Sequence, residues 1–436
     1  MSMVIDIHCH LFNADDIPIK GVIDSRAPKF IAVILDKILQ AIAPGDRLAS
    51  EPDSLDEMND EEIILLLHHI LETDKEARRH FQENFEGETS GDALSGVEKL
   101  ALVKRYIRWI RLLSRSHGTI ARKIRHTYPE VDLFVPLMMD MDYWFDDQAK
   151  SNIRQQFKIL SKISLRSNGS IHPFVAFDPE RERRFPGQPD GSLALVRDAV
   201  MKHGFLGVKL YPPLGYTPAG NEAILPPSPH PHDYNEVFDT LFRYCQENEI
   251  PITTHCTNGG AEAQDGFGVF ADPKFWDPIL EKYPKLRVNF AHFGGDRDLV
   301  ANHENSWAWK IGALMQDYPH VYADTGHHSI PFDKELRHSF FKQLELLFMT
   351  FPKAKERLMF GTDWHMIVRT KGYKKFYKRY LKTYSAHFTE SETDQFVAGN
   401  AIRFLGLQPG EKGRERLYQY YTRNGLEFPA WWNQVG

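Results

Sequence analysis

The stretch Val4-Ile5-Asp6-Ile7-His8-Cys9-His10 decides how the rest of the chain is interpreted, because it reads as a buried strand that ends in two histidines. Its apolar residues are of the types that favour strands. Side chains alternate between the two faces of a strand, so His8 and His10 point one way and Cys9 points the other. Two imidazoles on one face can hold one metal ion, although an isolated His-x-His is more often a pair of ordinary surface histidines.

From residue 131 onward the chain repeats one pattern, in which an apolar strand is followed by a loop and an amphipathic helix. Seven further strands are expected at residues 131–137, 171–177, 206–211, 252–255, 287–292, 320–324 and 358–363. Strands that alternate with helices imply a parallel sheet, and eight such units predict an α/β fold, the (β/α)8 TIM barrel. An open doubly wound sheet is the alternative, but no Gly-x-Gly-x-x-Gly motif follows the first strand.

A long segment without strand signals separates the first strand from the second. Helical patterns cover residues 30–43, 60–85 and 95–128. The last of these helices is basic around an apolar stripe, which usually marks a solvated face, with attachment to an acidic partner as the alternative. We therefore expect a barrel formed by residues 1–12 and 129–407, a large helical insertion after strand 1 at residues 13–128 that serves as a lid or in oligomerisation, and a C-terminal tail at residues 408–436 packed on the barrel.

The composition favours a globular protein that acts on a small molecule. The 436 residues are 42% hydrophobic and 26% charged, with a net charge of -6, which gives no electrostatic reason to expect nucleic acid or an anionic membrane as a partner. The sequence has no apolar run long enough for a bilayer and no signal-peptide pattern, so a cytoplasmic location is expected. Its three cysteines are too few for a disulfide framework. A small-molecule substrate is the expected partner, and a homo-oligomer stays an open alternative.

Polar residues recur at the ends of the predicted strands, where a barrel gathers them on one face. They are His8 and His10 on the first strand, Lys209 in the fourth, His255 and His292 at the ends of the fifth and sixth, and Asp363 at the end of the eighth. Imidazole nitrogens and a carboxylate oxygen are the ligands of Zn²⁺ and similar ions. Core packing does not explain so many polar groups, because each would need its own buried partner. We therefore predict a divalent metal site.

The same residues carry a family resemblance. Their order along the chain, with the local strings GVKLYPP, THC, AHFGG, FGTDW and NAIRFLGL, resembles the amidohydrolase superfamily. Within it, the strings are most similar to the branch that contains aminocarboxymuconate semialdehyde decarboxylase and related metal-dependent hydrolases. The resemblance covers the barrel and not the insertion. It indicates fold and metal more than substrate, because relatives carry out hydrolysis, decarboxylation and hydration.

The resemblance implies roles for the strand-end residues. His8, His10, His255 and Asp363 would hold one divalent ion, most simply zinc. His292 would act as a general acid or base, and Asp363 would also accept a proton. Lys209 has two alternatives: carboxylated and bridging two ions, as in binuclear relatives, or charged and binding a substrate carboxylate. One ion is favoured over two.

Other residues at strand ends are candidates for the wall of a substrate site. Arg297 could clamp a carboxylate, or Asp296 and Asp298 could neutralise it in a surface turn. The other substrate-binding candidates are Tyr211, His328 and Trp364, and Asp324, His327 and His365 also lie on the active face. His230 and His232, in a proline-rich loop, are expected to be solvated.

Three functions are compatible with this pattern. The first is a metal-dependent hydrolase that acts on a small carboxylated or cyclic substrate through metal-activated water. The second is a non-oxidative decarboxylase of an aromatic or unsaturated acid. His-x-His on the first strand favours hydrolysis slightly, since many aromatic acid decarboxylases of this branch begin with Glu-x-His. The third, a non-catalytic barrel, predicts the loss of a ligand, and none is missing.

Overall fold

The computed structural model describes residues 3–18, 20–22, 96–223 and 233–435, together with isolated positions between 65 and 79. Most of the predicted insertion therefore lies outside the described residues. This holds for the helix expected at 30–43, for nearly all of the helix expected at 60–85, and for His230 and His232.

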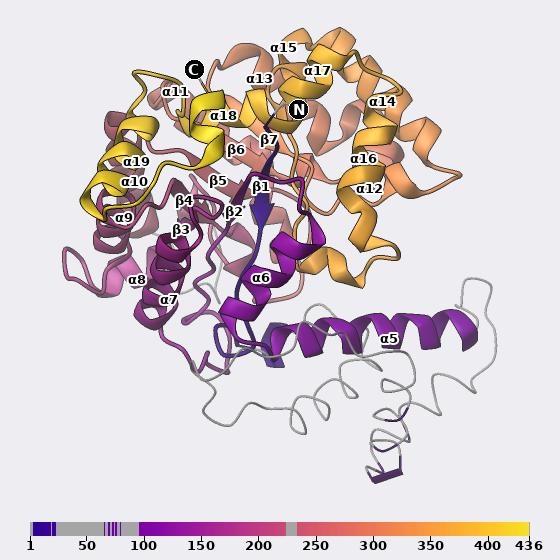
Figure 1. The fold of residues 1–436 in the computed structure, drawn as a ribbon, viewed down its shortest axis with the longest axis horizontal. Helices are drawn as coiled ribbons and strands as arrows, with labels where there is room; N and C mark the ends of the chain where they lie inside the picture. The colour runs from indigo at the N-terminus through magenta and orange to yellow at the C-terminus, as the bar shows by residue number, and fades with distance from the viewer. Residues whose placement is uncertain are drawn as a thin grey trace.

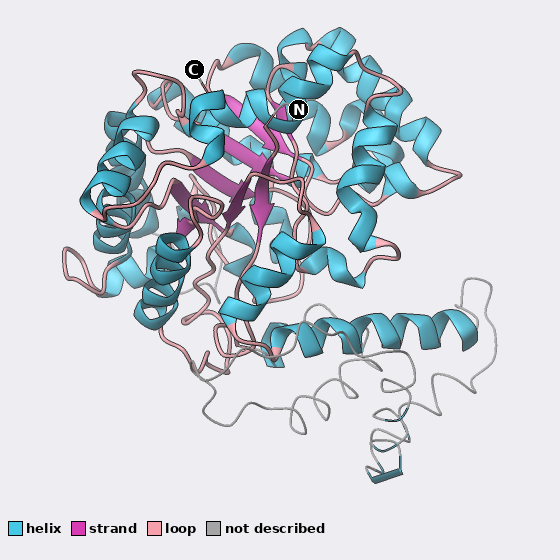
Figure 2. Cartoon of the chain, in the orientation of Figure 1, coloured by secondary structure: helices cyan, strands magenta, loops and turns pink. Residues whose placement is uncertain are grey.

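Eight short parallel strands form the centre of the molecule (Figure 2). They are β1 (Ile5–Cys9), β2 (Leu133–Pro136), β3 (Phe174–Ala176), β4 (Gly207–Leu210), β5 (Ile252–His255), β6 (Val288–Ala291), β7 (Val321–Asp324) and β8 (Leu358–Met359). Each lies within its predicted segment. The eighth is shorter than predicted: it ends at Met359, and Asp363, the last residue of the predicted segment, has a left-handed backbone (φ 57°).

The strands close into a barrel. Strands β3 to β8 pair in sequence order, and β1 pairs with β2. Bridges between Phe134 and Ile171 and between Leu137 and Phe174 join β2 to β3. On the other side, the amide of Ile7 donates to the carbonyl of Phe360 at 3.2 Å, which joins the end of β8 to β1. The predicted (β/α)8 TIM-barrel fold is confirmed.

Helices surround the barrel (Figure 1). Those before β5 are α5 (Gly96–Leu113), α6 (His117–Thr127), α7 (Ile153–Arg166), α8 (Pro179–Arg184), α9 (Ser192–Lys202) and α10 (Tyr234–Asn248). Those between β5 and β8 are α11 (Asp277–Lys282), α12 (Asp296–Asn302), α13 (Trp307–Asp317), α14 (Arg337–Thr350) and α15 (Pro352–Lys355). The last are α16 (Phe376–Tyr384), α17 (Glu390–Asp394), α18 (Asn400–Leu405) and α19 (Lys412–Arg423). Among the described residues, no helix is both long and apolar enough to cross a bilayer.

The basic helix predicted at residues 95–128 is two helices, α5 and α6, and the prediction of one continuous helix was wrong. Ser116 has an extended backbone, and its hydroxyl accepts a hydrogen bond from the amide of Thr119, so it caps α6 and ends the run. The arrow of β1 points toward the end of the barrel where α5 lies (Figure 1).

Helix α5 is hydrogen-bonded to the segment that follows β8. The indole N–H of Trp109 donates to Nδ1 of His365 at 3.0 Å, and Nε2 of His365 donates to the carbonyl of Phe12 at 3.0 Å. Burial lowers the pKa of His365 to about 3, so the ring is neutral and can accept at one nitrogen while donating at the other. The guanidinium of Arg369 lies 5.2 Å from the Trp109 ring. The described end of the insertion therefore contacts the mouth of the barrel.

The C-terminal segment packs against the outside of β1 to β3. Trp431, Trp432 and Tyr421 share an apolar core with Ile5 and Leu133 among others. A buried histidine connects this segment to the barrel: His172 donates from Nδ1 to the carbonyl of Gly204 at 2.7 Å, and its Nε2 accepts from the Tyr421 hydroxyl at 2.7 Å.

His172 should make the fold sensitive to acid. Burial lowers its pKa from 6.5 to about 4, although the bond to Gly204 opposes that shift. Stability from the neutral ring is therefore fully present above pH 6.5 and is lost as the pH falls toward 4. The loss at pH 5 comes to about 2 kcal/mol. Between about pH 7.5 and pH 5, His172→Gln should lose about 2 kcal/mol less free energy of unfolding than the wild type in urea titrations. Equal losses would mean that other groups cause the acid sensitivity.

Candidate metal centre

Three predicted ligands meet at the carboxyl ends of β1 and β8. His8, His10 and Asp363 are all buried, and each offers one ligand atom within 4.8 Å of the other two. The Oδ1 atom of Asp363 lies 3.2 Å from His10 Nε2 and 3.6 Å from His8 Nε2. They are the only described cluster of three or more histidine, cysteine or carboxylate side chains with such spacing.

Outer hydrogen bonds fix which nitrogen of each ring carries a proton. His10 Nδ1 contacts the carbonyl of Leu137 at 2.9 Å, and His8 Nδ1 contacts Oδ1 of Asp324 at 3.0 Å. Both partners are acceptors, so both Nδ1 atoms are protonated. When each ring is neutral, its Nε2 atom presents a lone pair to Asp363. Histidines that bind a metal through one ring nitrogen usually donate the other ring N–H to a carboxylate or a carbonyl, as His8 does to Asp324.

Asp324 stays ionised despite complete burial. Burial raises its pKa, but its contacts with His8, His292 and Asn289 outweigh that effect and hold the pKa below its ordinary value. Asp324 also accepts from the amides of His292 and Gly326 and from the side chain of Asn289. A Cβ at residue 326 would lie 2.7 Å from His8 Nδ1, so glycine is needed there for the ring to reach Asp324.

Two more imidazoles extend the cluster along β6 and β5. The ring of His292 lies 4.6 Å from that of His8 and 4.7 Å from that of His255, between ring centroids. His292 Nδ1 donates to the carbonyl of Gly326 at 2.9 Å, so its Nε2 carries a lone pair, which faces His255 Nδ1 at 3.1 Å. Burial lowers the pKa of His292 well below its ordinary value.

His255, the fourth predicted ligand, lies one ring away from the group of three. Its Nδ1 contacts His292, and its Nε2 lies 2.9 Å from the carbonyl of Gly259 and 3.1 Å from the Thr257 hydroxyl. The structure therefore brings together three of the four predicted ligands and places the fourth on the wall of the same cavity.

Lys209 lies in the floor of this cavity and is 2% exposed. Among the described residues its ammonium has no hydrogen bond or ion pair. Its Nζ lies 5.8 Å from the centroid of the Tyr211 ring. Burial lowers its pKa to about 8, while the charges of Asp324 and Asp363 oppose that shift.

The cavity above the metal ligands has apolar walls. The volume of the cavity is about 40 Å³, so the space is narrow. The apolar lining consists of Phe12, Ile17, Val22, Trp109, Met139, Met141, Ala261 and Met366. The floor is polar and the upper walls are apolar, as is usual for a small-molecule site.

A residue that sequence analysis left without a role contacts Asp363 directly. His327 lies after β7, and its Nδ1 is 2.7 Å from Oδ2 of Asp363. Asp324, also without an assigned role, proves to be the partner of His8. The available signal was position alone, since Asp324 ends β7 and His327 follows it on the face where the predicted ligands lie.

The predicted substrate-binding residues fall in different places. Tyr211 lines the cavity, and its hydroxyl accepts from the amide of Ala261 at 2.7 Å. Arg297 is exposed on α12 because Asp296 turns inward to accept from the amides of Ser329 and Ile330.

Neither of the remaining two candidates lines the cavity. Buried His328 lies behind His292 and contacts its carbonyl at 2.9 Å through Nε2. Trp364 is fully buried and packs against Tyr128 and Tyr373, with ring centroids 5.9 and 5.8 Å away.

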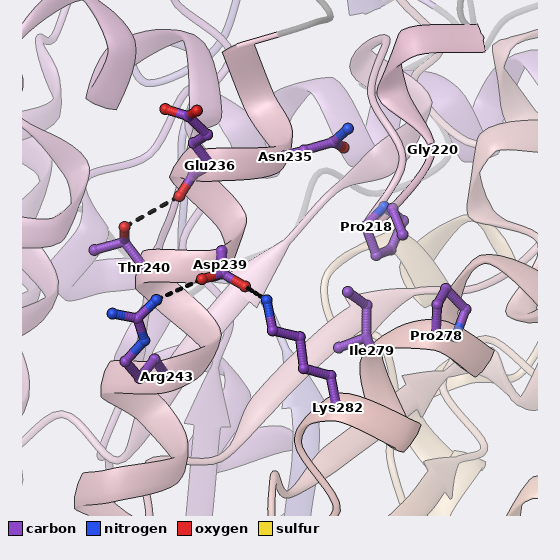
Figure 3. Close-up of a pocket in the computed structure, with 11 residues that line it drawn as sticks. Pro218, Gly220, Asn235, Glu236, Asp239, Thr240, Arg243, Pro278, Ile279 and Lys282 are labelled. Atoms are coloured by element: carbon purple, nitrogen blue, oxygen red, sulfur yellow. Dashed lines mark hydrogen bonds and ion pairs between the residues drawn. The ribbon is translucent and has the colours of Figure 1, made fainter.

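A second hollow lies on the outer surface between α10 and α11 (Figure 3). One of its two acidic residues, Asp239, already accepts from Arg243 at 2.6 Å and pairs with Lys282. Those contacts, with the Tyr283 hydroxyl, outweigh desolvation and lower the pKa of Asp239 to about 2. None of the predicted site residues lines this hollow.

Solved structures with a similar backbone fold have low sequence identity to this chain. One is an uncharacterised TIM-barrel protein from Bordetella bronchiseptica, with 16% identity, a TM-score of 0.43, and 65% of this chain and 82% of that chain covered. Another is a zinc-bound amidohydrolase from Burkholderia multivorans, with 13% identity, a TM-score of 0.44, and coverage of 68% and 91%. A third is 5-carboxyvanillate decarboxylase from Sphingomonas paucimobilis, with 10% identity, a TM-score of 0.47, and coverage of 93% and 99%.

The sequence itself matches a known family over more than half of its length. The matched region is residues 175–407, which begins in β3 and ends directly after α18. It includes Lys209, His255, His292 and Asp363, while His8 and His10 precede it. On this match the chain belongs to the amidohydrolase family, as the resemblance of its strand-end residues indicated.

Proposed function

We propose that this amidohydrolase-family protein is a metal-dependent hydrolase that acts on a small carboxylated or cyclic substrate. One observation carries the proposal: Nε2 of His8, Nε2 of His10 and Oδ1 of Asp363 converge in a buried cavity. With both rings neutral and protonated at Nδ1, acceptors face one another there, an arrangement that is unfavourable unless a cation lies between them.

The residues present fit a divalent ion such as zinc. Two imidazoles and a carboxylate are a common zinc ligand set at catalytic sites, and both imidazoles have the outer acceptors that such sites use. His255 remains the proposed fourth ligand, because it lines the same cavity. When bound, a divalent ion supplies a Lewis acid that lowers the pKa of water from its bulk value toward about 7.

The neighbouring side chains are suited to proton transfer and to substrate binding. The buried, neutral His292 has a lone pair on Nε2 and can accept a proton there. Lys209 as an ammonium would bind the carboxylate of a substrate, which favours one ion over the binuclear arrangement with a carboxylated lysine.

A decarboxylase of an aromatic or unsaturated acid is the second candidate. The observation in its favour is the combination of apolar walls, including Phe12 and Trp109, with one cation in the floor. An aromatic acid would place its ring against the walls and its carboxylate at Lys209.

Removing a ligand should abolish metal binding. His8→Ala, His10→Ala and Asp363→Asn should each weaken zinc binding by more than about 100-fold, since losing a ligand costs more than the 10–100-fold typical of an outer partner. Elemental analysis and calorimetric titration of metal-free protein measure this. His338→Ala, which removes an exposed histidine on α14, is the control. Absence of stoichiometric transition metal from protein purified without chelators would contradict the proposal.

Product analysis separates the two reactions. Metal-loaded protein should open a small lactone without releasing CO₂ from phenolic acids such as 5-carboxyvanillate. Release of CO₂ with no ring opening would reject hydrolysis in favour of the second candidate.

Lys209 should govern the binding of carboxylated substrates under either reaction. Lys209→Met keeps the length of the side chain and removes its charge. It should raise the KM of a carboxylated substrate by about 10–100-fold, which corresponds to a lost charge-assisted hydrogen bond. The KM of an uncharged ester should stay nearly constant. Equal effects on both substrates would indicate a structural role, and loss of a metal ion in this variant would instead support a bridging carboxylated lysine.

A further inference from the structure

The two oxygens of Asp363 have separate partners. Oδ1 faces His8 and His10, whereas Oδ2 lies 2.7 Å from Nδ1 of His327. Nδ1 must be protonated at this bond, because an ionised carboxylate only accepts. The side chain of His327 is 34% exposed, and its Nε2 has no hydrogen bond to any described residue. Its only directional polar side-chain contact in the described part of the chain is therefore with Asp363.

The backbone on both sides of this bond adopts an uncommon conformation. His327 has φ 62° and Asp363 has φ 57°, both in the left-handed region that residues other than glycine rarely occupy. The amide of His327 approaches the carbonyl of Thr362 at 3.4 Å, and the amide of Asp363 donates to the carbonyl of His8 at 2.7 Å. The segments after β7 and β8 thus contact each other through backbone and side chains, and the strained conformations persist because these contacts hold them.

Each of the three proposed ligand residues has one outer hydrogen-bond partner. Asp324 holds His8, the carbonyl of Leu137 holds His10, and His327 holds Asp363. Two of these partners come from one place, the end of β7 and the turn after it, three residues apart. Strand β7 carries no proposed ligand, yet it lies between β6 and β8 and supports ligands on β1 and after β8.

From this arrangement we infer that His327 is a positioning residue for the metal centre. It holds Asp363 by Oδ2, so that Oδ1 stays directed at the Nε2 atoms of His8 and His10. Without this bond the carboxylate can rotate and exchange its two oxygens. The inference rests on the proposed function, because it requires that these three residues bind a metal.

Two substitutions separate this role from a backbone effect. Asparagine tolerates a left-handed backbone and places an amide N–H close to the position of His Nδ1, whereas glycine tolerates the backbone and provides no donor. In calorimetric titration of the metal-free protein with zinc, His327→Gly should bind about 10–100-fold more weakly than wild type. His327→Asn should stay within about threefold, since its donor restores the contact.

A distant pair provides the matched control. His387 Nδ1 contacts Oε1 of Glu345 at 2.8 Å, which is the same kind of histidine–carboxylate bond away from the cavity. His387→Asn should leave zinc affinity unchanged. If His327→Gly does not fold, His327→Gln replaces it, because its amide lies one carbon too far out, and it should show the same 10–100-fold loss.

The outcomes distinguish this inference from the proposed function. Equal zinc affinity in the wild type and in His327→Gly, or equally weak affinity in His327→Gly and His327→Asn, would overturn the positioning role. Should the wild type bind no zinc and His8→Ala behave identically, the metal centre itself would be rejected. A wild type that binds zinc, with a loss confined to the variants without a donor, supports both.

Discussion

The seam between β8 and β1 closes the barrel and also forms the candidate metal centre. At this seam the amide of Asp363 donates to the carbonyl of His8 at 2.7 Å, and the left-handed backbone of Asp363 brings its carboxylate to two imidazoles of β1. A shift of one strand against the other would change the closure of the barrel and the spacing of the ligand atoms together. The closure of the barrel and the geometry of the candidate metal centre therefore depend on the same few hydrogen bonds.

Burial determines the charge of this centre. It lowers the pKa of His10 and of His292, which favours neutral rings. It also raises the pKa of the carboxyls, but contacts with neighbouring histidines outweigh that effect for Asp324 and Asp363, so both remain ionised. Neutral imidazoles beside two buried carboxylates create a surplus of negative charge and of lone pairs. A divalent cation compensates both, whereas the Lys209 ammonium alone compensates one charge.

The sequence predicted the barrel and the main residues of the centre, because both follow from local patterns. Apolar strands repeated at regular spacing, and His8, His10 and Asp363 stood where such strands end. The roles of Asp324 and His327 depend on which strands are neighbours and on two left-handed residues, and neither can be derived from spacing. Arg297 was placed on the active face by position alone, but the inward turn of Asp296 directs it to the surface.

The polar floor and the apolar walls of the cavity come from different parts of the chain. The polar floor of the cavity comes from β1, β4, β5, β6 and the end of β8, whereas Trp109 belongs to α5 and Ile17 and Val22 to the segment after β1. His365 joins the two parts, since it follows Asp363 by two residues and accepts the indole N–H of Trp109. A change in the insertion can therefore alter the shape of the roof while the metal ligands stay in place. Different insertions on the same barrel would in this way give cavities of different shape above the same polar floor.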